Sequence, residues 1–165
     1  MVSGLGRRFP EVDPIRDELE RTKWIWVACC VAPLIYLLAA HWIQRQWFHE
    51  KGHAGLLTLE GQTRSLLAII FLGAQILLQG AVTGVRHYFG VQLTKNRPQG
   101  IKVLMALYRK RTLVLCAISE TAALLGFLYF LAVGDFRALF VGGVAAYTFY
   151  AQSYPSEHGL ARYLQ

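Results

Sequence analysis

The chain has 165 residues, of which 55% are hydrophobic and 16% are charged. Soluble domains average about 45–50% apolar and about 25% charged residues, so an ordinary soluble domain is excluded and an integral membrane protein is favoured. The formal net charge of +7 is explained by the Lys and Arg excess of cytoplasmic loops, and we expect no nucleic-acid partner.

Residues 1–23 are rich in charge and precede the first apolar run. Asp13 is a good helix N-cap and Pro14 suits a first turn, so we predict a short amphipathic helix from 13 to 23 at the membrane interface. A charged stretch of this length does not resemble a cleavable signal peptide. We therefore expect a cytoplasmic N-terminal segment leading into a first span that is retained.

Four apolar segments predict an all-α integral membrane bundle of four transmembrane helices. The first three are close to the roughly 20 residues that cross the hydrocarbon core, and the fourth is short. Trp24, Trp26 and Trp42 bracket the first segment, as expected of an aromatic belt at the headgroups. The predicted spans cover about 24–43, 65–85, 112–133 and 138–154, and residues 155–165 form a tail.

The Lys and Arg distribution predicts an orientation. Segments 1–23, 86–111 and the C-terminal tail share one side of a four-span protein and hold thirteen Lys and Arg residues, whereas 44–64 and 134–137 hold four. The positive-inside rule then places both termini in the cytoplasm. We expect a bacterial inner membrane, with the bilayer and other membrane subunits or further copies of the chain as partners.

The connection 86–111 carries seven basic residues and no acidic one. Pro98 begins a helical pattern in which an apolar stripe containing Leu104 and Met105 lies beside basic side chains. This pattern predicts a second cytoplasmic interfacial helix, 98–111, in anionic headgroups. The candidate lipid- or partner-binding residues are Lys102, Arg109, Lys110 and Arg111.

Glu120 lies well inside the third apolar segment, where an ionisable group costs at least about 2.5–3.5 kcal/mol and therefore needs a reason. Counting a similar depth along the second and fourth spans reaches Gln79 and Tyr150. We predict that the three side chains meet in one buried polar layer. Desolvation would favour the neutral carboxyl, which could bind a proton or cation, or serve as a hydrogen-bonded link between helices.

Residues 119–127 (Ser-Glu-Thr-Ala-Ala-Leu-Leu-Gly-Phe) resemble the second helix of the rotor c subunit of rotary ATP synthases. In that family an ion-binding Glu is followed by small and apolar residues and a Gly about one and a half turns later. The resemblance implies ion binding at Glu120, although no span has the regularly spaced glycines of that family's first helix. The overall layout also resembles small uncharacterised bacterial four-span membrane proteins, which implies no activity.

His49-Glu50-Lys51-Gly52-His53 matches H-E-x-x-H, which on a helix places two imidazoles on one face for zinc and a Glu as general base. Glu60 could supply a third ligand. Gly52 inside the helix and the shortness of the connection argue against this arrangement. The motif nevertheless makes His49 and His53 candidate metal ligands.

The sequence thus supports three functional hypotheses. The preferred one is a non-enzymatic accessory, structural or assembly subunit of a larger membrane complex, without a cofactor. The second is a proton or cation pathway through Glu120, and the third is a membrane zinc metalloprotein using His49, Glu50 and His53. The chain has no Gly-rich phosphate loop and no G-x-S-x-G motif.

Overall fold

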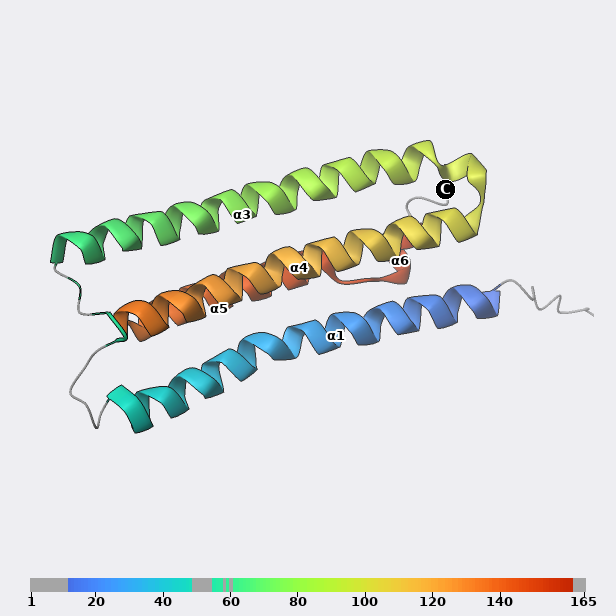
Figure 1. Cartoon of the computed structure of the whole chain (residues 1–165). Coiled ribbons are helices and arrows are strands. Elements are labelled where there is room, and N and C mark those ends of the chain that lie inside the picture. The colour runs from blue at the N-terminus through green and yellow to red at the C-terminus, as the bar shows by residue number, and fades with distance from the viewer. Residues whose placement is uncertain (1–11, 49–54, 58, 60, 162–165) are drawn as a thin grey trace, which may run out of the picture.

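The computed structural model describes residues 12–48, 55–57, 59 and 61–161, and this part of the chain is all-α (Figure 1). A π-helical turn, η1, follows the first helix, and a short 3₁₀ turn, η2, precedes the third long helix. The elements are α1 (Val12–Ile43), η1 (Gln44–Phe48), α3 (Gly61–Lys95), η2 (Arg97–Gln99), α4 (Ile101–Val133), α5 (Phe136–Ser153) and α6 (Glu157–Ala161).

Three of these helices are long and apolar enough to cross a bilayer. Their most apolar windows lie within Arg16–Gln46, Gly61–Lys95 and Ile101–Val133 and have mean hydropathies of 1.8, 2.0 and 1.9. α5 has 18 residues and is not among them, because Arg137, Gln152 and its tyrosines lower its hydropathy. The fold is therefore that of an all-α protein with membrane-type helices, and α5 is a fourth, more polar helix.

α4 is the centre of the bundle, with α1 and α3 on either side and α5 lying along it (Figure 1). The backbones of α4 and α5 lie in close contact. A Cβ added at Gly126 would lie 3.0 Å from Gly142 Cα, and one added at Gly142 would lie 2.9 Å from Gly126 Cα. Such small-residue contacts let helices pack closely where hydrophobic burial gives no driving force. Ala146, one turn further along α5, is completely buried.

The C-terminal end of α4 is closed by the connection that precedes α3. The last carbonyls of a helix have no partner within it. Here the Leu56 and Leu57 amides donate to the Leu131 and Ala132 carbonyls over 2.9 and 3.1 Å. The Gly134 amide donates to Phe130, and Gly134 has the left-handed conformation (φ 75°) that favours glycine at a helix end.

At the opposite end α1, α3 and α4 extend together, and we call residues 12–23, 86–111 and 154–161 the basic end. Here a second core contains Leu19 of α1, Leu93 of α3, Leu104 and Met105 of α4, and Leu160 of α6. Its members come from four helices, and all are at most 6% exposed. The basic end is therefore a packed helical extension of the bundle.

The helices predicted for residues 13–23 and 98–111 are continuous with the long apolar helices. Residues 12–23 are the start of α1, and residues 101–111 are the start of α4, each continuous with its apolar segment. Leu19 and the stripe of Leu104 and Met105 pack against one another in this second core.

Candidate functional site

Glu120 lies half-buried on α4 and accepts two hydrogen bonds from neighbouring helices. The Tyr36 hydroxyl of α1 donates to Glu120 Oε1 over 2.5 Å, and the Tyr150 hydroxyl of α5 donates to Oε2 over 2.9 Å. Each carboxylate oxygen thus has one tyrosine partner. The cluster of Tyr36, Glu120 and Tyr150, which we call the tyrosine–glutamate clasp, joins three helices.

Two of the three residues predicted for the polar layer meet in the clasp. Glu120 and Tyr150 are hydrogen-bonded, whereas the Gln79 side chain is exposed on α3. Tyr36 takes the place expected for Gln79. The signal for Tyr36 was its position in the middle of the first span, because a tyrosine away from the aromatic belts needs a partner for its hydroxyl.

Aromatic contacts fix both tyrosines. The Tyr36 ring stacks on Phe127 with a centroid separation of 5.3 Å and an interplanar angle of 19°. Trp26 packs edge-on to Tyr150, and its indole N–H lies 3.1 Å from the Tyr150 carbonyl and 3.2 Å from Ser153 Oγ. The Tyr150 carbonyl belongs to the last turn of α5, so Trp26 also helps to satisfy that helix end. Trp26 therefore belongs to the bundle, whereas Trp24 is 71% exposed.

The clasp is suited to holding helices together. A carboxylate is stabilised by hydrogen bonds from hydroxyl groups. The two tyrosines therefore lower the free-energy cost of placing Glu120 at apolar depth. In the described part of the chain no Lys, Arg or His side chain is bonded to Glu120. Proton or cation transfer would require further polar groups on both sides of the carboxylate.

α3 contacts α4 through one face only. Gln75 is buried there and donates from Nε2 to the Ala122 carbonyl over 3.1 Å, while its Oε1 has no partner in the described chain. The opposite face is open, because a Cβ added at Gly73, Gly80 or Gly84 would have no neighbour within 4 Å.

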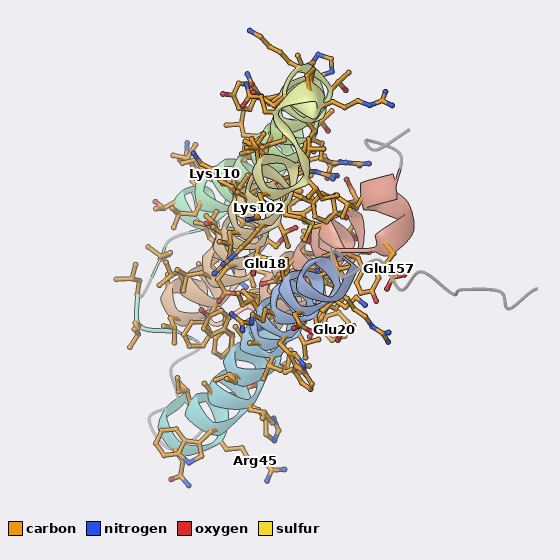
Figure 2. All side chains as sticks on the ribbon, turned by 90° about the vertical axis from the view of Figure 1, so that its right-hand side faces the viewer. Glu18, Glu20, Arg45, Lys102, Lys110 and Glu157 are labelled. Carbon is orange, nitrogen blue, oxygen red and sulfur yellow. The ribbon has the colours of Figure 1, made fainter. Side chains whose placement is uncertain are left out.

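The predicted basic cluster on α4 is divided among different surroundings. Arg109 Nη1 forms an ion pair with Glu18 Oε1 over 3.0 Å, and Arg111 lies half-buried with its guanidinium carbon 5.7 Å from the Tyr108 ring centroid. Lys102 and Lys110 are exposed, and Figure 2 shows them on the α4 side of this end, opposite Glu157. The structure therefore does not bring the four residues together on one surface.

The predicted metal motif lies outside the described residues, which applies to His49, Glu50, His53 and Glu60 alike. Within the described ranges, no group of three or more His, Cys, Asp or Glu side chains is placed to hold a metal ion.

Comparison with protein-family models, curated protein sequences and solved structures finds no match to this chain.

Proposed function

We propose that this protein is an accessory subunit of a larger membrane complex and that α3 docks on a transmembrane helix of a partner. In this proposal the chain crosses the membrane four times, α5 being the fourth span, with both termini in the cytoplasm of a bacterial cell. The observation that carries the proposal is the open face of α3. We define it as Ile69, Gly73, Ile76, Leu77, Gln79, Gly80 and Gly84.

The open face has the composition of a helix-packing surface. Gly73, Gly80 and Gly84 recur at intervals of seven and four residues, which places them on one side of a helix. Ile76 and Leu77 flank them and are 72% and 76% exposed. Small residues between larger apolar ones allow the backbone of a second helix to approach closely.

Gln79 favours a protein partner over lipid alone. Its side chain is exposed beside Gly80 at apolar depth, and within the described chain its amide has no hydrogen-bond partner. Acyl chains cannot hydrogen-bond to an amide, whereas a polar side chain or a backbone carbonyl on another helix can. The partner helix should thus present small residues and a hydrogen-bonding group at the depth of Gln79.

The clasp supports a structural role for the rest of the bundle. Both Glu120 oxygens are engaged by tyrosines that join α1, α4 and α5. This arrangement would keep three helices fixed while α3 meets the partner. An ion-pathway role would instead make flux in proteoliposomes depend on Glu120, so unchanged flux in Glu120→Gln would exclude it.

Site-specific photo-crosslinking in native membranes tests the proposal. A photoreactive residue replaces Leu77 on the open face or, as a control, Leu38 on α1, which is 69% exposed. We expect Leu77, and not Leu38, to give an adduct that mass spectrometry maps to a transmembrane segment of a different protein. An adduct only with a second copy of the chain, or equal labelling from both positions, would overturn the proposal.

Matched glycine variants add a second readout. Gly80→Leu would fill the open face and reduce the Leu77 adduct. Gly143→Leu adds the same side chain on α5, where no atom lies within 4 Å of the new Cβ, and should leave the adduct unchanged.

A further inference from the structure

A hollow of about 600 Å³ opens on α3 at the basic end. Its described lining comes from three turns of this helix, and Gly90 contributes no side chain, which leaves room between its neighbours. The Thr94 hydroxyl is turned back to the Gly90 carbonyl over 3.0 Å. The lining residues are Arg86, His87, Gly90, Val91, Thr94 and Lys95.

The hollow is basic and its charge is not neutralised by an acid in the described chain. Arg86 Nη1 donates to the neutral Gln152 Oε1 of α5 over 2.9 Å, which orients the guanidinium and leaves its charge intact. Lys95 takes part in none of the ion pairs found there, which are Lys23–Glu20, Arg64–Asp135 and Arg109–Glu18. An anion is therefore the chemically favoured occupant.

The position of the hollow matches the headgroup layer. Val85 ends the apolar run of α3, and Arg86 and His87 follow immediately. Tyr88 is 59% exposed at this level, as expected of an aromatic side chain at a membrane interface. Lys95 lies about 14 Å beyond Arg86 along the helix, and its long side chain can reach back toward the bilayer.

We propose that this hollow binds the phosphate headgroup of an anionic phospholipid in the leaflet at the basic end. Arg86 and Lys95 would contact the headgroup oxygens from the two ends of the hollow, and the acyl chains would extend from Arg86 along the apolar run that ends at Val85. A lipid is favoured over an acidic protein segment because the hollow lies where a span leaves the hydrocarbon, so the headgroup needs no chain to deliver it. The site uses residues outside the open face and does not depend on the accessory-subunit proposal.

Native mass spectrometry of the detergent-purified full chain, titrated with phosphatidylglycerol or phosphatidylcholine, tests the site. Wild type should retain phosphatidylglycerol in preference to phosphatidylcholine. Arg86→Gln and Lys95→Gln should each weaken phosphatidylglycerol retention roughly fivefold, which is the factor for one basic charge near a membrane surface. Inorganic phosphate at millimolar concentration should compete weakly, since it lacks the acyl chains.

Arg21→Gln on α1 is the matched control, because it removes one exposed positive charge from the same end of the molecule. Its retention should stay within twofold of wild type. An equal loss in Arg21→Gln would mean general attraction to a basic surface and would overturn the site. The site is equally overturned if wild type shows no preference for phosphatidylglycerol, or if an oligoglutamate peptide binds through Arg86 and Lys95 while phosphatidylglycerol does not.

Discussion

At the scale of single residues, Glu120 should contribute to stability through its two tyrosine bonds. Interhelical hydrogen bonds in membranes contribute about 0.6–2 kcal/mol each, so Glu120→Ala should lower the free energy of unfolding by about 1–4 kcal/mol. Glu120→Gln keeps one carbonyl acceptor and should lose about half as much. Denaturation of the purified protein in mixed micelles measures both.

The control for Glu120 is its neighbour Thr121, which is exposed and whose hydroxyl is bonded within α4 to the Ala117 carbonyl. Thr121→Ala should leave stability unchanged. If Glu120→Ala were as stable as Thr121→Ala, the clasp would contribute nothing to the fold.

Gln75 leads to a prediction of the opposite sign. Its Nε2 bond to the Ala122 carbonyl contributes about 1 kcal/mol, but its Oε1 is buried without a partner in the described chain, which costs about 1–3 kcal/mol. Gln75→Met keeps a side chain of similar shape and removes both the Nε2 hydrogen bond and the unpaired Oε1. The variant should be as stable as wild type or up to about 2 kcal/mol more stable in the same denaturation assay, and a clear loss would show that Oε1 has a partner.

The sequence predicted the depth of each polar residue in its span, but not the direction of its side chain around the helix, as Gln79 and Tyr36 show. The rise of 1.5 Å per residue fixed the depth of each group, and so correctly predicted that Glu120 and Tyr150 meet. The rise does not say which side of a helix faces the bundle. That side is normally read from an apolar stripe, and α3 is apolar on nearly all sides, so no stripe distinguished buried Gln75 from exposed Gln79.

At the scale of elements, the α4–α5 contact depends on Gly126. An added Cβ would lie 2.9 Å from the Ala138 carbonyl oxygen, which is backbone and cannot move aside. Gly126→Val should therefore separate the helices and destabilise the bundle by about 2 kcal/mol or more, a typical cost of overpacking. Gly143→Val, with no atom within 4 Å of its Cβ, should change stability far less. Equal effects would contradict the close approach.

Element boundaries were predicted less well than element identity. The four apolar segments each contain a helix, but the structure extends the first three by 10 to 12 residues at the basic end. The predicted spans end where the charged residues of 13–23 and 98–111 begin, because hydropathy alone cannot reveal the neighbour of an apolar stripe. The core of Leu19, Leu93 and Leu104 explains why these segments remain helical beyond the apolar runs.

At the scale of the whole molecule, the long helices exceed a bilayer. α1, α3 and α4 have 32, 35 and 33 residues, or roughly 50 Å each at 1.5 Å per residue, against about 30 Å of hydrocarbon. The excess at the basic end forms the second core, which holds the start of α1 beside α6. Both ends of the described chain thus lie at the same end of the bundle, as expected for an even number of crossings, and this supports the proposal that α5 is the fourth span.

Cysteine accessibility in a background with Cys29, Cys30 and Cys116 replaced by Ala tests this topology. Glu20 and Glu157 are exposed at the basic end (Figure 2), whereas Arg137 begins α5 at the other end. We expect a membrane-impermeant maleimide to label Glu20→Cys and Glu157→Cys only from the cytoplasmic side and Arg137→Cys only from the opposite side. Labelling of Glu20→Cys and Glu157→Cys from different sides would mean that α5 does not cross. Three crossings by α1, α3 and α4 place Glu20 and Arg137 on opposite sides. Labelling of all three positions from one side would therefore contradict those crossings. The Lys and Arg excess predicts the side, because moving thirteen basic residues across the membrane would cost far more than moving four.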